Sequence, residues 1–235
     1  MRCRRIGHRR PLACGLLAAP RQDAWPAAQG ESGMESLLDG YRRFRAQVWP
    51  AERERYEALS RYGQRPQTMV VGCSDSRVDP RSIFGAAPGE LFEVRNVAGL
   101  VPPYHPDADY HGTSAALEYG VRVLGVARIV VLGHSQCGGV RAMVEGSPEQ
   151  ARDFVEPWMR IAEPARRALA GHGGASDRLE RGEAEVVRLS LANLRTFPWI
   201  EAAVAAGRLQ LAGFRFDIAT GVLAEVAADR LIPVT

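Results

Sequence analysis

Three residues with reactive or charged side chains follow the apolar run 69–71 in the segment MVVGCSDSRVDP. Cys73, Asp75 and Arg77 alternate with serines, and in an extended chain this spacing puts their side chains on one side. A thiolate beside a carboxylate is electrostatically unfavourable unless a cation lies between them. Zn²⁺ would serve as that cation; alternatively, Arg77 draws Asp75 aside by donating two hydrogen bonds to its carboxylate.

A second apolar run leads into VVLGHSQCGG, residues 130–139, which places His134 and Cys137 three positions apart. The start of a helix after Cys137 favours a thiolate there, and the pair Gly138-Gly139 lets the backbone approach closely. Together with Cys73 these residues form a set of two cysteines and one histidine, which is a recognised set of zinc ligands. Asp75 is then the candidate fourth ligand, and Arg77 decides whether it binds.

Three alternatives compete with a catalytic zinc site. A lone buried cysteine is most often a small hydrophobic residue, and a lone histidine at a strand end is most often hydrogen-bonded. A purely structural zinc would use four protein ligands, namely Cys73, Asp75, His134 and Cys137. Thiol catalysis by Cys73 would need no metal. Because each motif ends a predicted strand, the two motifs together favour a metal site.

Strands alternate with helices in the middle of the chain, which is typical of a mostly parallel sheet flanked by helices, the α/β class. The carboxyl ends of such strands collect the working site, and Cys73 and His134 both lie at strand ends. The predicted strands are 68–73, 89–96 and 127–134, and the predicted helices between and after them are 112–125 and 138–146.

An N-terminal helical arm begins near Met34, and Pro50 is expected to end or kink it. A charged helix follows and stops at Gly63. After the second motif, two charged helical stretches are predicted at about 148–171 and 178–196. The late segment RLQLAGFRFDIATGVLAEV predicts a β-hairpin that turns at Thr220-Gly221.

The composition argues against several classes of partner. The formal charge of +3 on 235 residues is small, and arginines at positions 2, 4, 5, 9 and 10 supply the excess, so no nucleic acid is expected. No apolar run reaches the roughly 18 residues that span a bilayer, and four cysteines are too few for a disulfide scaffold, so we expect a cytoplasmic protein. Residues 1–33 are expected to be a disordered or targeting extension, with Met34 as an alternative start, and residues 34–235 to be the functional domain.

The motifs CSDSRVDP, RNVAGLVPPY, GTSAALEYGV and VVLGHSQCGG, in this order, closely resemble the β-class carbonic anhydrases. The resemblance implies a zinc enzyme that hydrates carbon dioxide reversibly to bicarbonate and a proton, by attack of a zinc-bound hydroxide. It implies Cys73, His134 and Cys137 as zinc ligands, and Asp75 with Arg77 as a dyad that orients the hydroxide. It also implies a homodimer or higher homo-oligomer with active sites at the subunit interface.

The resemblance extends to the substrate pocket. Plant-like members line it with a glutamine, a phenylalanine and a tyrosine, and Gln64, Phe92 and Tyr119 occupy the matching positions; we expect Gly138 to line it as well. Bicarbonate-inhibited members carry a tryptophan where this chain has Val70, although Arg95 matches an arginine used at their inhibitory site. A sulfur analogue of carbon dioxide, such as carbon disulfide or carbonyl sulfide, remains an alternative substrate.

Overall fold

The computed structural model of the protein describes residues 33–107, 109–171 and 173–235. They fall into two compact units, one ending at Arg53 and one running from Glu54 to Thr235. The extension predicted for the N-terminus concerns residues 1–32, which lie outside the described residues. No helix in the described part of the chain is long and apolar enough to cross a membrane.

The N-terminal segment is helical, as predicted, and of the two effects expected of Pro50, an end or a kink, the end is not observed. Helix α1 (Met34–Arg43) continues through a π-helical turn at Phe44–Val48 into α2 (Trp49–Tyr62). A proline cannot donate the amide hydrogen bond of a helix, and a π-turn is a common way to accommodate such a defect. The predicted stop is confirmed: Gly63 has φ 76°, and its N–H donates to the carbonyl of Leu59 at 3.0 Å.

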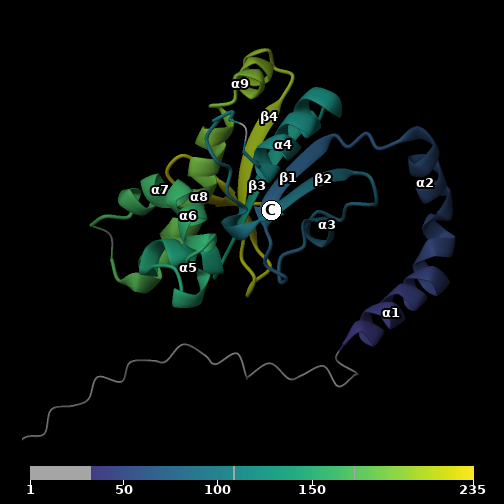
Figure 1. Ribbon diagram of the computed structural model, residues 1–235, viewed down its shortest axis with the longest axis horizontal. Helices are drawn as coiled ribbons and strands as arrows, with labels where there is room; N and C mark the ends of the chain where they lie inside the picture. The colour runs from purple at the N-terminus through teal and green to yellow at the C-terminus, as the bar shows by residue number, and fades with distance from the viewer. Residues whose placement is uncertain (1–32, 108, 172) are drawn as a thin grey trace, which may run out of the picture. The chain divides into compact units, whose positions relative to one another are not determined.

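The larger unit is built on a mixed sheet in which the site-bearing strands are parallel (Figure 1). Across the described residues the strand order is β2-β1-β3-β4-β5-β6. Strands β1 and β3 are direct neighbours, with Gly72 opposite Leu132 in the register. The strands are β1 (Thr68–Cys73), β2 (Leu91–Asn96), β3 (Arg128–His134), β4 (Gln210–Phe216), β5 (Leu223–Val226) and β6 (Leu231–Pro233).

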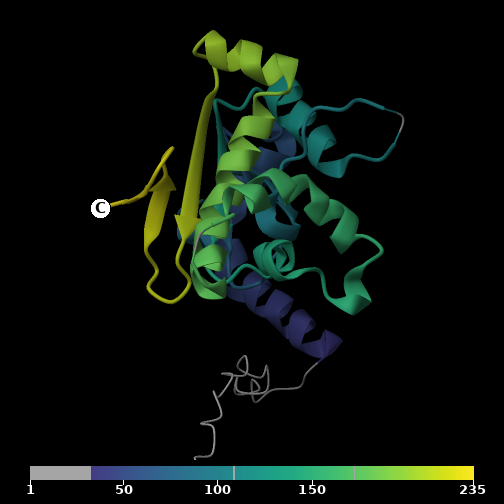
Figure 2. The ribbon, with the colours of Figure 1, turned by 90° about the vertical axis from the view of Figure 1, so that its left-hand side faces the viewer.

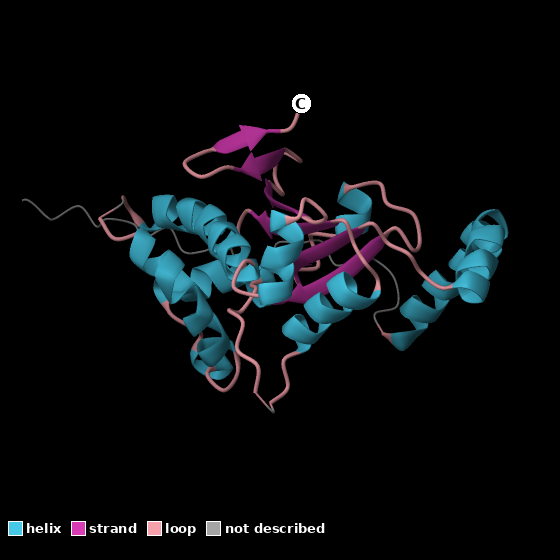
Figure 3. Ribbon diagram, turned by 90° about the horizontal axis from the view of Figure 1, so that it is seen from above, coloured by secondary structure: helices cyan, strands magenta, loops and turns pink. Residues whose placement is uncertain are grey.

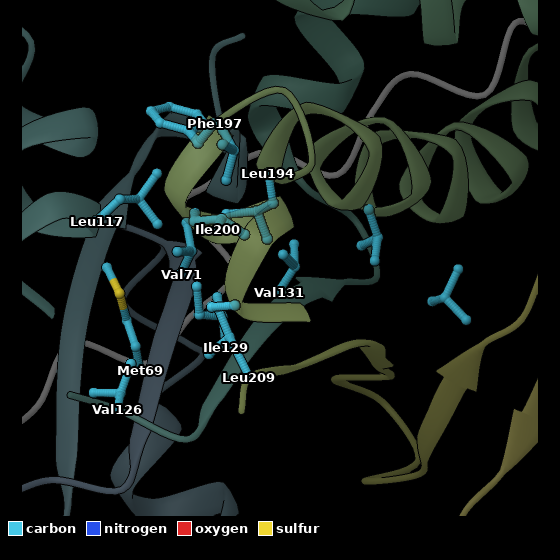
Figure 4. Close-up of a cluster of buried hydrophobic side chains, with 14 of the residues drawn as sticks. Met69, Val71, Leu117, Val126, Ile129, Val131, Leu194, Phe197, Ile200 and Leu209 are labelled. Carbon is cyan, nitrogen blue, oxygen red and sulfur yellow. The ribbon is translucent and has the colours of Figure 1, made fainter. Parts of the chain in front are cut away.

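The period-two alternation of the central strands sorts their side chains into separate packing clusters. Met69 and Val71 of β1 and Ile129 and Val131 of β3 are almost fully buried on one face (Figure 4). Helices α4 (Gly112–Glu118) and α8 (Ala175–Leu194) cover this face, because Leu117 and Leu194 belong to the same cluster. The even-numbered residues of both strands point the other way, where Val70, Val130 and Leu132 pack near Ile83 of α3. Cys73 is also odd-numbered, and it packs in a cluster with residues of helix α5 (Gly138–Glu145).

Helices of the larger unit flank the central strands in the view of Figure 3, and two of these helices lie next to the site. Helix α5 begins directly after Cys137, and α8 packs along β3 and β4. Gly133 allows this packing, since a β-carbon there would lie 2.7 Å from a methyl group of Val187 on α8. The helices of this unit are α3 (Pro80–Ile83), α4 (Gly112–Glu118), α5 (Gly138–Glu145), α6 (Val155–Met159), α7 (Glu163–Ala168), α8 (Ala175–Leu194) and α9 (Pro198–Ala205).

Two predicted helices differ in detail from the structure. The helix expected at 112–125 is α-helical to Glu118 and then forms a π-helical turn at Tyr119–Val123. The stretch expected at 148–171 is broken into short α-helical and 3₁₀ pieces, with prolines at positions 157 and 164. A proline removes an amide donor, so a long regular helix cannot run through either position undisturbed.

The C-terminal hairpin is confirmed. Strands β4 and β5 are antiparallel, and Figure 2 shows them side by side at the edge of the molecule. The turn is held by Asp217, whose N–H donates to Val222 at 2.8 Å and whose carbonyl accepts from Gly221 at 2.8 Å. Gly221 has φ 72°, which glycine adopts without strain. Strand β6, which pairs with β5, was not predicted.

Candidate metal centre

Neighbouring strand ends bring the two sequence motifs together. Cys73 is the last residue of β1 and His134 the last residue of the adjacent parallel strand β3. Cys137 follows after a short turn and occupies the N-cap position of α5. All three side chains are buried, with exposed fractions of 7 % for Cys73, 1 % for His134 and 4 % for Cys137. The predicted meeting of the motifs at the carboxyl edge of the sheet is therefore observed.

The three side chains converge on one small volume. The sulfur atoms of Cys73 and Cys137 lie 3.9 Å apart. The two sulfurs and a ring nitrogen of His134 all lie within 4.8 Å of one another. A tetrahedral zinc with bonds of about 2.3 Å to sulfur spaces two thiolates by about 3.8 Å. The spacing of the sulfurs thus fits a zinc ion without movement of the backbone.

His134 is oriented so that one ring nitrogen is left for a ligand. Its Nδ1 lies 2.9 Å from the carbonyl oxygen of Ser135, so Nδ1 carries the proton and donates. This leaves Nε2 with a free lone pair. Within the described residues, this buried Nε2 has no hydrogen-bond partner. A buried polar atom without a partner is costly, and a metal ion would satisfy it.

The two thiols influence each other strongly. The hydrogen bond from Cys137 lowers the pKa of Cys73 to about 4, against the effect of burial. The same contact, together with burial, raises the pKa of Cys137. Without a cation the pair therefore gives up one proton readily and the second with difficulty. Backbone N–H groups of Gly139 and Val140, at the start of α5, act in the opposite direction and favour a Cys137 thiolate. A divalent cation between the sulfurs would stabilise both as thiolates.

Asp75 is held beside these three residues by Arg77. Arg77 donates from Nε to Oδ1 of Asp75 at 2.9 Å and from Nη2 to Oδ2 at 2.7 Å. The Arg77 side chain and backbone N–H lower the pKa of Asp75 to about 2, so the carboxylate is ionised at neutral pH. Its Oδ2 lies 3.9 Å from Nε2 of His134. In this structure Asp75 stands outside the three-residue group, bound to Arg77 in the two-pronged manner that the sequence offered as one of two alternatives.

Arg95 supports the loop that carries the dyad. It donates from Nε to the carbonyl of Cys73 at 2.9 Å, and from Nη2 to the carbonyls of Asp75 at 2.7 Å and Val78 at 2.6 Å. From the sequence, Arg95 was expected only to match an arginine of the inhibitory site. These three contacts form only because the loop turns its carbonyl groups towards Arg95. The path of the loop cannot be read from a local sequence pattern.

The predicted pocket residues are not all near the metal centre within one chain. Phe92 pairs with Met69, four residues before Cys73 along β1, which corresponds to about 13 Å. The Tyr119 ring lies beside Phe92, with centroids 6.0 Å apart, and Gln64 lies exposed in the loop before β1. Gly138, by contrast, directly follows Cys137 and is exposed.

Two further histidines share a partner. His105 Nδ1 lies 3.2 Å and His111 Nε2 lies 2.6 Å from the carboxylate of Asp107. The sequence could not place either side chain in space.

The fold and the site together define a class: an α/β protein with a cysteine-histidine-cysteine zinc centre at the carboxyl edge of its sheet. The donor types and the 3.9 Å separation of the sulfurs fit zinc, as does the ring nitrogen that has no hydrogen-bond partner among the described residues. The class is wide, and comparison with known proteins narrows it.

The family model of carbonic anhydrases matches residues 68–223. A carbonic anhydrase of Pseudomonas aeruginosa is 40% identical over 190 residues, covering 80% of this chain and 85% of that protein. The solved structure of the β-carbonic anhydrase CcaA superposes with a TM-score of 0.81 at 32% identity, covering 87% of this chain and 93% of that one. A structure described as a tetrameric β-carbonic anhydrase from Sordaria macrospora has a TM-score of 0.74 at 28% identity, with coverages of 84% and 98%.

The chain belongs to the β-class carbonic anhydrases, which are zinc enzymes and lyases. The family predicted from the motifs is thus confirmed. So is the mostly parallel sheet flanked by helices.

Proposed function

We propose that this enzyme hydrates carbon dioxide reversibly to bicarbonate and a proton, with Asp75 and Arg77 acting as a dyad beside a zinc ion. The observation that carries the proposal is the position of the ionised Asp75 carboxylate. It is fixed by Arg77 and lies 3.9 Å from the ring nitrogen that would bind the metal. Family membership supports the reaction, and the geometry supports the roles.

Sγ of Cys73, Nε2 of His134 and Sγ of Cys137 would hold the zinc. When bound, the ion supplies a Lewis acid that lowers the pKa of a water ligand far below its bulk value. Three protein ligands leave one position of a tetrahedral site open. This is the arrangement of catalytic zinc sites, whereas structural sites use four protein ligands.

Asp75 acts on the attacking oxygen as a hydrogen-bond acceptor. Because its pKa is about 2, the carboxylate can only accept at the pH of the reaction. An oxygen that donates to Asp75 has its remaining lone pairs turned away from the carboxylate and towards the substrate. Arg77 keeps Asp75 in this role by occupying both carboxylate oxygens. The same low pKa makes Asp75 a poor proton acceptor, so the proton released by hydration leaves by another route.

The substrate pocket is proposed to need a second copy of the chain. Phe92 and Tyr119 lie together at the far end of β1 from Cys73, so one chain does not bring them to its own metal centre. A symmetric dimer places the same surface of both subunits at the interface, so in our proposal Phe92 and Tyr119 of each subunit complete the site of its partner. The Sordaria macrospora relative, described as tetrameric, is consistent with a homo-oligomer here. Gln64 would donate to a substrate oxygen, Phe92 and Tyr119 would keep the pocket apolar, and Gly138 would line it beside Cys137.

Two residues support the plant-like subclass. Val70 is fully buried where bicarbonate-inhibited members carry a tryptophan. Arg95, which matches an arginine of their inhibitory site, donates its hydrogen bonds to the carbonyls of Cys73, Asp75 and Val78. We infer that the state in which Asp75 bonds to Arg77 is the resting state.

Stopped-flow hydration of carbon dioxide, with zinc counted on the same sample, tests the proposal. One zinc per chain with rapid turnover would support it. One zinc per chain without turnover would instead favour a structural zinc or a sulfur analogue, and carbon disulfide and carbonyl sulfide would then be assayed.

A further inference from the structure

The turn between His134 and Cys137 contains a residue in an unusual conformation. Gln136 has φ 58°, in the left-handed region that residues other than glycine seldom adopt. Such a conformation persists only where the surrounding contacts impose it. The contacts that hold Gln136 therefore bear on the geometry of the centre.

Both polar groups of the Gln136 backbone are engaged, and by different parts of the molecule. Its N–H donates to Oε1 of Glu183 at 2.6 Å. Its carbonyl oxygen accepts from Nη2 of Arg77 at 3.1 Å. The same Nη2 donates to Oδ2 of Asp75. A continuous line of hydrogen bonds thus joins Glu183 to the dyad through one residue of the turn.

Glu183 reaches the turn from the middle of α8. Its side chain is 5% exposed, and a buried carboxylate is costly unless both oxygens have partners. Oε1 accepts from Gln136, and Oε2 accepts from Nε of Arg215 on β4 at 2.8 Å. The carboxylate therefore has one donor for each oxygen. None of the hydrogen bonds that Glu183 makes within the described residues goes to a zinc ligand.

We propose that Glu183 is a positioning residue, which fixes the left-handed turn at Gln136 so that the Gln136 carbonyl faces Arg77 and keeps Arg77 on Asp75. The inference rests on the proposed role of the dyad. Without an acceptor at Oε1, the Gln136 N–H would be left unpaired and the turn would lose the contact that imposes its conformation. The carbonyl could then rotate away, and Arg77 would lose one of the partners that orient it.

The test must separate the hydrogen bond to Gln136 from the buried ion pair with Arg215. Removing Arg215 alone would leave the Glu183 carboxylate buried without its cation, and removing Glu183 alone would leave Arg215 with only its longer, 3.6 Å contact to Asp217. Two double variants avoid this. The first combines Glu183→Gln with Arg215→Met and keeps an acceptor oxygen for the Gln136 N–H. The second combines Glu183→Met with Arg215→Met and removes it. The two proteins differ only at position 183, in side chains of similar length.

Turnover, KM and zinc content are measured for both proteins, and hydrogen exchange of the 134–138 segment supplies a readout independent of activity. For the variant without the acceptor we expect kcat at least about tenfold lower, KM within about threefold of wild type, one zinc per chain and faster exchange. The variant with the acceptor should keep kcat within about threefold of wild type and slow exchange. Equal kcat in the two double variants would overturn the inference. So would a loss of zinc in proportion to the loss of turnover.

A third variant keeps the inference testable if a double variant does not fold. Glu183→Asp keeps a negative charge for Arg215. Its side chain is one methylene shorter, so the carboxylate oxygen lies farther from the Gln136 N–H. We expect the same fall in kcat with zinc retained, and an unchanged kcat would overturn the inference. Arg77→Ala, assayed in parallel, distinguishes a failure of the proposed dyad from a failure of the proposed role of Glu183. If Arg77→Ala stays fully active, the proposed dyad itself fails; if it is inactive while the double variants agree, only the role of Glu183 fails.

Discussion

Arg77 donates a hydrogen bond to each oxygen of the Asp75 carboxylate, from Nε to Oδ1 at 2.9 Å and from Nη2 to Oδ2 at 2.7 Å. A guanidinium makes this two-pronged contact because its donors lie in one plane, and no other side chain can replace it in that geometry. The contact keeps Asp75 beside the zinc ligands rather than among them. On the proposed function, Arg77, which is not itself a ligand, decides whether the fourth zinc position stays open.

Arg77→Ala should therefore keep zinc and lose turnover. Released from Arg77, Asp75 is free to take the fourth position, and an oxygen misplaced by about 1 Å already costs about 100-fold in rate. Stopped-flow assays and zinc counts on the same sample check this. Arg81→Ala, which removes an exposed arginine of α3, is the control and should retain turnover. Full activity of the Arg77 variant would refute the dyad.

Cys137→Ser should lose zinc itself. Replacing a ligand should weaken binding by more than the 10–100-fold that loss of a supporting contact typically costs. Nε2 of His134 and the Cys73 sulfur would remain, but two donors do not hold a structural or catalytic zinc. Zinc per chain after dialysis against a competing chelator measures the effect. Ser74→Ala, next to Cys73 but exposed, should keep one zinc per chain, and equal zinc retention in both variants would exclude Cys137 as a ligand.

Gly139→Ala should destabilise the protein, because its added methyl group would clash with Ala98. A β-carbon on Gly139 would lie 2.7 Å from that of Ala98, whereas one on Gly138 would meet nothing within 4 Å. Overpacking a tight contact typically costs about 1–3 kcal/mol. The midpoint of thermal unfolding should fall in Gly139→Ala and stay near that of wild type in Gly138→Ala. Equal midpoints would show that α5 can shift away from Ala98 without loss.

These residues also show what a sequence can reveal. Cys73 and His134 were predicted to meet because strand periodicity and chain order are local patterns, and parallel strands end at one edge of a sheet. Glu183 was missed because its bond to Gln136 spans 47 positions, and nothing near either residue marks the contact. The left-handed Gln136 was missed for a related reason, since only tertiary contacts impose that conformation on a glutamine.

The pocket shows a different limit. The motif match placed Phe92 and Tyr119 at the expected positions in the sequence, and the structure brings their rings within 6.0 Å of each other. Yet the strand register puts them beside Met69 rather than Cys73. The resemblance implies active sites at the subunit interface, but only the strand register reveals that these residues lie far from the metal centre of their own chain. Short elements were also not predicted from the sequence. Strand β6 spans three residues, which are too few to show a periodic pattern.

Stability should depend on pH through Glu183. Burial raises the pKa of this carboxyl above its ordinary value of 4.5, although Arg215 acts in the opposite direction. A group with a raised folded-state pKa stabilises the protein fully below the unfolded pKa and loses that contribution as pH rises through the folded pKa. Glutamine does not titrate. The midpoint of thermal unfolding of wild type minus that of Glu183→Gln should therefore decrease as pH rises above 4.5. The zinc ligands titrate in both proteins and cancel in the difference, and a difference that increases with pH would contradict this assignment.

Mixing two defective variants should raise turnover above their average if the pocket is shared between copies. Cys137→Ser removes the metal, and Gln64→Ala removes a proposed substrate contact on an exposed loop. In a mixed symmetric dimer one site then carries both defects and the other carries none, so random mixing should restore about a quarter of wild-type turnover. Each variant alone, taken through the same dissociation and reassociation, is the control. Turnover no higher than the average of the two separate variants would mean that Gln64 serves the metal centre of its own chain, or none.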